Sequence, residues 1–89
     1  MLKLVTTNQF EKDFDKIIKR GKNQEKLFLI MQKILNRERL DESCKDHPLK
    51  GQLTGRRECH VEPDWLLIYL KKSDRIIFER TGTHSDLFE

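Results

Sequence analysis

Alanine is absent from this sequence, and cysteine, proline and glycine are scarce. The two cysteines, Cys44 and Cys59, are too few for the disulfide framework of a small secreted domain, although a single bridge between them remains open. Residues 1–5 lack the apolar run of a signal peptide. No stretch of apolar residues is long enough to span a bilayer. These absences predict a cytoplasmic protein without a membrane anchor.

The residues that are present describe a small core under a densely charged surface. Leu, Ile, Val and Phe supply 26 of the 89 residues, well above the level of a disordered chain. Lys and Arg outnumber Asp and Glu by 18 to 15, and charged residues make up 37% of the chain. A net charge of +3 is modest and is by itself weak evidence for a nucleic-acid partner. At this length we expect one domain that spans residues 1–89.

The N-terminal half has the periodicity of a short strand followed by two helices. Residues 2–4 alternate between apolar and charged side chains, as a strand does. Asn8 is placed to cap a helix, with Glu11 completing a capping box, and Gly21 is a natural stop for that helix. A second helix is predicted from about residue 23 to 36. The apolar stripes of the two helices are Phe10, Phe14, Ile17 and Ile18, and Leu27, Ile30, Met31, Ile34 and Leu35.

The periodicity changes after the second helix. Residues 41–55 have no regular period and are predicted to form a loop or an edge segment. Residues 57–62 then alternate in character, which places Glu58, His60 and Glu62 together on one face of a strand.

Two further strands complete the predicted sheet. Residues 65–70 are almost all apolar, as in a strand that is covered on both faces, and residues 76–78 form the next strand. The aromatic residues of these strands are expected in the core: Trp65, Tyr69 and Phe78. The helices must bury their stripes on this sheet. The sequence therefore predicts an α+β domain in which an N-terminal strand and a two-helix hairpin pack on an antiparallel sheet.

Residues suited to proton transfer gather in the C-terminal half. All three histidines lie there, at His47, His60 and His84, and neighbouring strand ends of a meander lie close together. Imidazole exchanges protons near neutral pH, and Arg80 offers a fixed positive charge to a phosphate. With the carboxylate of Asp64, these groups suffice for phosphodiester cleavage through a ribose 2′-hydroxyl. Only one carboxylate is well placed, so a two-metal nuclease is not expected.

The same residues also have purely structural explanations. Arg80 can pair with Glu58 or Glu62 on a neighbouring strand, and Asp64 after Pro63 suits a turn. A zinc site is a further alternative, at a spacing that matches no standard finger, through Cys44, His47, Cys59 and His60.

Three blocks of sequence resemble the YafQ-like branch of the RelE/ParE toxin superfamily. The blocks are Lys45-Asp46-His47-Pro48-Leu49-Lys50-Gly51, Cys59-His60-Val61-Glu62-Pro63-Asp64-Trp65-Leu66-Leu67-Ile68-Tyr69 and Phe78-Glu79-Arg80-Thr81-Gly82-Thr83-His84. The resemblance implies the RelE-like microbial RNase fold. It also implies an mRNA interferase, the toxin of a type II toxin–antitoxin pair, which cleaves mRNA in the ribosomal A site and is silenced by a cognate antitoxin.

The resemblance also implies residue roles, with no metal or other cofactor. The catalytic set of the family falls on His47, His60, Asp64 and His84. Arg80 falls on the phosphate-binding arginine and Phe88 on a terminal aromatic that contacts substrate. We expect His84 to be the general acid, and Asp64, or a histidine that it orients, to be the base. Arg80, His47 and His60 are expected to hold the scissile phosphate. Glu58 stands where the YafQ pattern carries Asp, so its role is left open.

Two other functions fit the same chain. ParE-type members of the superfamily share the fold and inhibit DNA gyrase by binding, without catalysis. The third hypothesis is an inert module that only binds an antitoxin or RNA. The histidine set favours the enzyme, because a protein that acts by binding alone has no need of it.

Overall fold

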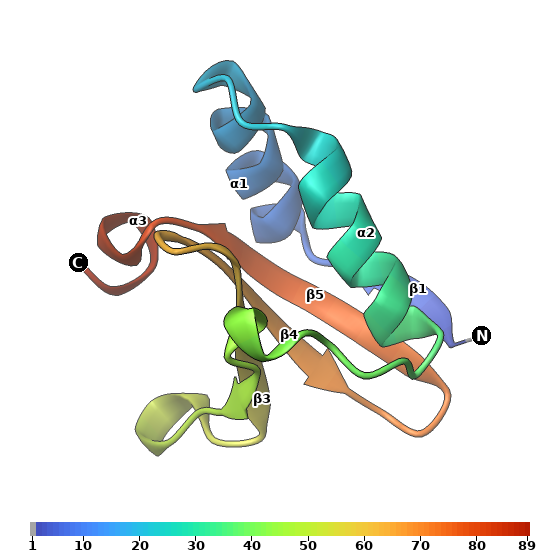
Figure 1. Cartoon of the computed structure of the whole chain (residues 1–89). Coiled ribbons are helices and arrows are strands. Elements are labelled where there is room, and N and C mark those ends of the chain that lie inside the picture. The colour runs from blue at the N-terminus through green and yellow to red at the C-terminus, as the bar shows by residue number, and fades with distance from the viewer. Residues whose placement is uncertain (1) are drawn as a thin grey trace.

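The computed structural model describes residues 2–89. Five strands form one sheet in the order β1-β5-β4-β3-β2, and two long helices cover one face of it (Figure 1). The strands are β1 (Lys3–Thr6), β2 (His47–Pro48), β3 (Arg56–Glu62), β4 (Trp65–Lys71) and β5 (Arg75–Gly82). The helices are α1 (Asn8–Lys19), α2 (Gln24–Leu35) and the short α3 (His84–Phe88), with 3-10 turns at Glu42–Cys44 and Gly51–Leu53. The predicted α+β class is confirmed. No helix within residues 2–89 has the length and apolar character needed to cross a membrane.

Both long helices begin and end close to their predicted limits. α1 starts after Thr7, whose hydroxyl accepts a hydrogen bond from the Phe10 amide at 3.0 Å. The predicted cap at Asn8 is wrong by one residue, because Thr7 has the extended backbone of a cap and Asn8 is already helical. Gly21 follows α1 with a φ of +88°, a conformation that favours glycine. Asn23 caps α2 in the same way as Thr7 caps α1.

The sheet is mixed. β3, β4 and β5 form the predicted antiparallel meander. β1 pairs with β5 in parallel, which the antiparallel prediction did not include. A parallel pair needs a long connection, and the whole chain between these two strands supplies it. The segment predicted as loop or edge, residues 41–55, contains the two-residue edge strand β2.

β4 lies at the centre of the core. Residues 65–69 are all buried, which confirms a strand covered on both faces. The indole of Trp65 donates a hydrogen bond to the Thr81 hydroxyl at 2.9 Å, so its polar atom is satisfied inside the core. The three predicted core aromatics are each at most 3% exposed. The helices close the core with buried Phe10, Ile17, Leu27, Met31, Ile34 and Leu35.

We expect Leu27→Ala to lower the free energy of unfolding by about 2–5 kcal/mol, because Leu27 is fully buried and its truncation leaves a cavity. Leu29 lies on the same helix but is 61% exposed, so Leu29→Ala is expected to change it by less than about 0.5 kcal/mol. Urea denaturation followed by circular dichroism measures both values. Equal losses in the two variants would contradict this packing of α2.

Candidate active site

The carboxylate of Glu58 lies between two of the predicted histidines. His47 on β2 is the register partner of Glu58 on β3, and His60 lies two residues further along β3. Nε2 of His47 and Nε2 of His60 lie 3.9 Å and 3.8 Å from the same oxygen, Oε1 of Glu58. Glu58 is only 6% exposed, so these two imidazoles are the groups that its negative charge faces most closely.

Backbone carbonyls fix the orientation of both rings. Nδ1 of His47 lies 2.6 Å from the Lys45 carbonyl oxygen, and Nδ1 of His60 lies 3.1 Å from the Pro63 carbonyl oxygen. A carbonyl only accepts, so Nδ1 is the donor in each contact. Nε2 is therefore the ring nitrogen of each histidine that can take up a proton, and a proton taken up there lies close to the Glu58 carboxylate.

His84 is paired with Asp64 at the other end of the site. His84 is the first residue of α3, and Asp64 lies in the turn between β3 and β4. Oδ1 of Asp64 accepts from the His84 amide at 3.1 Å and lies 3.3 Å from Nδ1 of the His84 ring. These two contacts, the backbone amide first, lower the pKa of Asp64. Both side chains are more than half exposed, so the His84 ring is open to a ligand.

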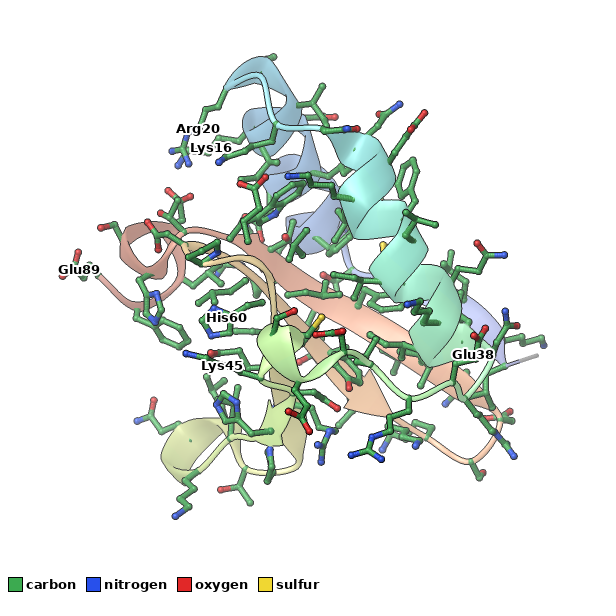
Figure 2. All side chains as sticks on the ribbon, viewed as in Figure 1. Lys16, Arg20, Glu38, Lys45, His60 and Glu89 are labelled. Atoms are coloured by element: carbon green, nitrogen blue, oxygen red, sulfur yellow. The ribbon has the colours of Figure 1, made fainter. Side chains whose placement is uncertain are left out.

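These groups come together on one face at the end of the sheet. The ring centroids of His60 and His84 are 6.3 Å apart, and those of His84 and Phe88 are 5.8 Å apart. A cavity of about 260 Å³ opens beside His60 and is also lined by Lys45 and Pro63; Figure 2 shows His60 and Lys45 side by side. Five of the six predicted site residues therefore form one continuous group: His47, His60, Asp64, His84 and Phe88.

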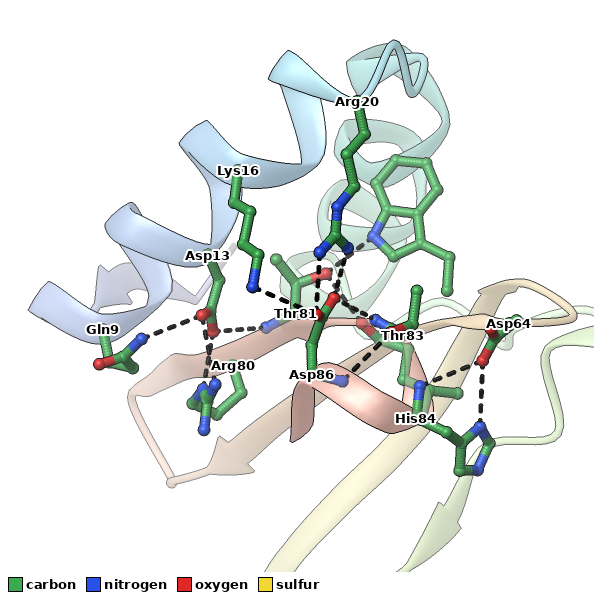
Figure 3. Close-up of polar contacts among 12 residues, drawn as sticks. Gln9, Asp13, Lys16, Arg20, Asp64, Arg80, Thr81, Thr83, His84 and Asp86 are labelled. Atoms are coloured by element: carbon green, nitrogen blue, oxygen red, sulfur yellow. Dashed lines mark hydrogen bonds and ion pairs between the residues drawn. The ribbon is translucent and has the colours of Figure 1, made fainter. Parts of the chain in front are cut away.

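Arg80 lies apart from this group, across β4. Arg80 and Glu58 are both register partners of Ile68, on opposite sides of that strand. The guanidinium is held by Asp13 of α1, with Nε at 2.7 Å from Oδ2 and Nη2 at 3.3 Å from Oδ1 (Figure 3). The predicted alternative, an Arg80 pair with a glutamate of the neighbouring strand, is therefore wrong. The reason is that α1 packs against β5 and brings Asp13 closer.

Glu62 does not share the face of His60, which corrects a second prediction. The register of β3 against β4 shifts between His60 and Glu62, and such an irregularity reverses the alternation of side chains beyond it. Glu62 instead accepts from Lys22 at 2.7 Å and Lys26 at 2.9 Å. These two ammonium groups lower the pKa of Glu62.

The zinc alternative receives no support from the geometry. Cys44 and Cys59 are both buried and both free thiols, so they also form no bridge. Burial raises the pKa of each thiol, which disfavours the thiolate that a metal binds. Within residues 2–89, no group of three or more His, Cys, Asp or Glu side chains is arranged to hold a metal ion.

Two acidic residues that support the site were not predicted. Asp13 is 7% exposed and accepts from Gln9, Arg80 and the Thr81 amide. One signal was available, because Asp13 lies three residues after Phe10 and so falls on the buried side of its helix, where a charge needs a partner. Asp86 is the other, and its signal was its place three residues after Thr83, because Thr-x-x-Asp has the spacing of a capping box.

Known bacterial toxins are similar to this chain over almost its full length. The profile of the family described as "Bacterial toxin of type II toxin-antitoxin system, YafQ" matches residues 2–89. The mRNA interferase toxin YafQ of Escherichia coli K12 is 46% identical over 84 residues, covering 92% of this chain and 90% of the relative. A copper-bound mutant toxin from Helicobacter pylori superimposes with a TM-score of 0.95 at 43% identity, covering 99% of this chain and 100% of that one. The toxin in the E. coli DinJ–YafQ toxin–antitoxin complex superimposes with a TM-score of 0.92 at 42% identity, covering 99% and 98%.

The fold is a five-stranded sheet covered by a helical hairpin, and it matches known toxins over nearly the whole chain. Together these findings define a toxin of the type II toxin–antitoxin class. The chain belongs to the YafQ family of these toxins.

Proposed function

We propose that this YafQ-family toxin is a ribosome-dependent endoribonuclease that cleaves mRNA in the ribosomal A site and is silenced by a cognate antitoxin. Its E. coli relative is named an mRNA interferase toxin, and 46% identity over most of both chains supports the same enzyme class here. The observation that carries the proposal is the convergence of His60, His84 and Asp64 on one open face.

His60 is assigned the role of general base. Its Nδ1 is bound to the Pro63 carbonyl, so Nε2 is free to accept the proton of the ribose 2′-hydroxyl. The imidazolium that forms faces the Glu58 carboxylate 3.8 Å away, which stabilises the positive charge. Asp64 is the poorer base, because its contacts with His84 lower its pKa and hold it as the carboxylate.

His84 is assigned the role of general acid. Asp64 contacts Nδ1 of the ring, which leaves Nε2 directed away from that carboxylate and able to protonate the leaving 5′-oxygen. Phe88 lies against the same ring and offers a face for a base next to the cut. Acid and base thus lie on separate elements, α3 and β3, with their ring centroids 6.3 Å apart.

Arg80 and His47 are assigned to the phosphate. Nε and Nη2 of Arg80 are bound to Asp13, and Nη1 has no hydrogen-bond partner within residues 2–89, so this nitrogen remains for a phosphate oxygen. The steps proposed here are proton transfers by the side chains of this chain. The water-exposed positions of His47 and His84 suit a substrate strand that lies across the face.

The antitoxin is proposed as the protein partner. The E. coli toxin of the same family is known in complex with DinJ, described as its toxin–antitoxin complex. A basic toxin suits an acidic and partly disordered antitoxin, which can fold over the site as it binds.

A paired assay tests the enzyme against the gyrase alternative. Purified toxin is added to ribosomes stalled with a defined codon in the A site, and separately to a DNA gyrase supercoiling reaction. We expect the message to be cut within the A site and gyrase to be unaffected, because the histidine face serves proton transfer. Inhibition of gyrase together with uncut message would replace this proposal by the binding-poison hypothesis.

A further inference from the structure

α3, the helix that carries the proposed general acid, is too short to be stable without contacts to the rest of the fold. α3 contains five residues, and none of its side chains is buried. Isolated helices shorter than about 12–15 residues are marginal in water. The position of His84 therefore depends on the contacts that α3 and the residue before it make with the rest of the fold.

Asp86 makes the strongest of those contacts. Its carboxylate accepts from Arg20 Nη1 at 2.6 Å, Arg20 Nη2 at 3.0 Å and Lys16 Nζ at 3.3 Å (Figure 3). The two Arg20 contacts form a bidentate pair, the geometry in which arginine binds a carboxylate best. The Arg20 guanidinium and the Thr83 amide lower the pKa of Asp86 well below its usual range. The contact therefore persists throughout the pH range in which imidazoles titrate.

The same carboxylate also fixes the backbone that leads into His84. Oδ2 of Asp86 accepts from the Thr83 amide at 3.0 Å, and the Thr83 hydroxyl accepts from the Asp86 amide at 3.2 Å, which completes a capping box. Gly82 has a φ of +155°, and a Cβ there would lie 2.9 Å from Oδ2 of Asp86. Asp86 is thus packed closely against the turn between β5 and α3.

We propose that Asp86 is a positioning residue for cleavage: Lys16 of α1 and Arg20, which caps the end of α1, hold its carboxylate, and this contact sets His84 against Asp64. The inference rests on the proposed role of His84. No hydrogen bond within residues 2–89 joins Asp86 to the His84 ring or to Asp64, and Asp86 acts through the backbone of α3. Its charge also raises the pKa of Asp64, an effect smaller than that of the His84 contacts. α1 holds both parts of the site, because its Asp13 also orients Arg80.

Single-turnover cleavage on programmed ribosomes tests this role with Asp86→Asn, which keeps the size of the side chain and removes its charge. We expect the rate constant at saturating toxin to fall by about five- to thirtyfold, the effect of losing one or two kcal/mol of ordering. The toxin concentration that gives half the maximal rate should change less than the rate constant, because His47 and Arg80, which are assigned to the phosphate, lie outside α3. The melting temperature should also change little, because α3 is a short terminal helix that contributes no buried side chain to the core.

Four further variants make the result specific to the contact. Asp86→Glu keeps the charge and the Thr-x-x-Glu form of the capping box, so it should keep the rate within about threefold. Arg20→Gln should lower the rate constant as much as Asp86→Asn does. The double variant should lower it no further than either single variant, because both substitutions remove the same interaction. Asp74→Asn is the control for charge, since Asp74 lies in an exposed turn and, within residues 2–89, its carboxylate has one charged partner, Arg75 at 4.0 Å. It should cleave at the parent rate.

An Asp86→Asn protein that cleaves at the parent rate, or losses that add in the double variant, would overturn the proposal. If the parent protein itself cuts no message, the proposed function fails, and a measurement independent of activity then decides the inference. The ¹H–¹⁵N heteronuclear NOE of residues 84–88 should fall in Asp86→Asn and not in Asp74→Asn. Equal values in the two variants would show that Asp86 does not order α3.

Discussion

Replacing His84 by alanine is expected to lower the single-turnover rate of mRNA cleavage by about 10²–10⁴-fold, the usual contribution of a general acid. The loss should appear in the chemical step, since a proton donor is needed only when the 5′-oxygen leaves. The fold should be retained. The His84 side chain is 58% exposed and leaves no core cavity, and the amide that bonds Asp64 is present in alanine as well.

Ser85→Ala is the matched control for this variant. Ser85 is the next residue of α3, it is exposed, and its side chain makes no hydrogen bond within residues 2–89. It should cleave like the parent, and circular dichroism and antitoxin binding should be the same for all three proteins. Arg80→Ala should instead weaken binding of the transition state, and of substrate as well, because its charge faces phosphate throughout. A folded His84→Ala protein that cuts at the parent rate would move the acid role to His47 or His60.

A message with 2′-deoxyribose at the cut site is expected to survive treatment that cleaves the all-ribose message completely. In the proposed reaction the 2′-oxygen attacks phosphorus and the bond from phosphorus to the 5′-oxygen breaks. The 2′-proton goes to His60, and His84 protonates the leaving oxygen. The products should be a 2′,3′-cyclic phosphate or 3′-phosphate and a 5′-hydroxyl, which mass spectrometry of the fragments identifies.

Two outcomes would contradict this mechanism. One is cleavage of the deoxy-substituted message at an undiminished rate, and the other is a product with a 5′-phosphate. Dependence on a divalent ion must be tested by substituting one metal for another. Ribosomes themselves require magnesium, so chelation would inactivate the ribosomes that the assay needs. The rate should be insensitive to the identity of the ion when ribosomes remain intact, since no metal takes part in the proposed proton transfers.

Much of the fold and the centre of the site were predictable from local pattern. The helical stripes gave α1 and α2 to within about one residue at their starts, because a buried helix face repeats every 3.6 residues. The apolar run of β4 predicted a strand buried on both faces. The alternation of β3 placed Glu58 and His60 on one face, and the structure adds that the Glu58 carboxylate also faces His47.

The interactions that cross the fold were beyond the reach of pattern. The β3 irregularity that moves Glu62 to Lys22 and Lys26 leaves no trace in the alternation, because any residue can be the extra one. The parallel pairing of β1 with β5 likewise depends on the path of the whole chain between them.

The sequence by itself determined which residues are able to do chemistry, and it placed His60 on its strand and Asp64 in its turn. It did not predict that the last strand reaches Gly82, nor that His84 begins the helix α3 in place of a loop. The tertiary structure alone decided their partners. Asp13 meets Arg80 across 67 positions of sequence, and Arg20 meets Asp86 across 66. The physical reason is that periodicity reports only whether a side chain faces the core or water. The partner of a charged side chain depends instead on how α1 lies across β5, and that is fixed by the packing of the whole core.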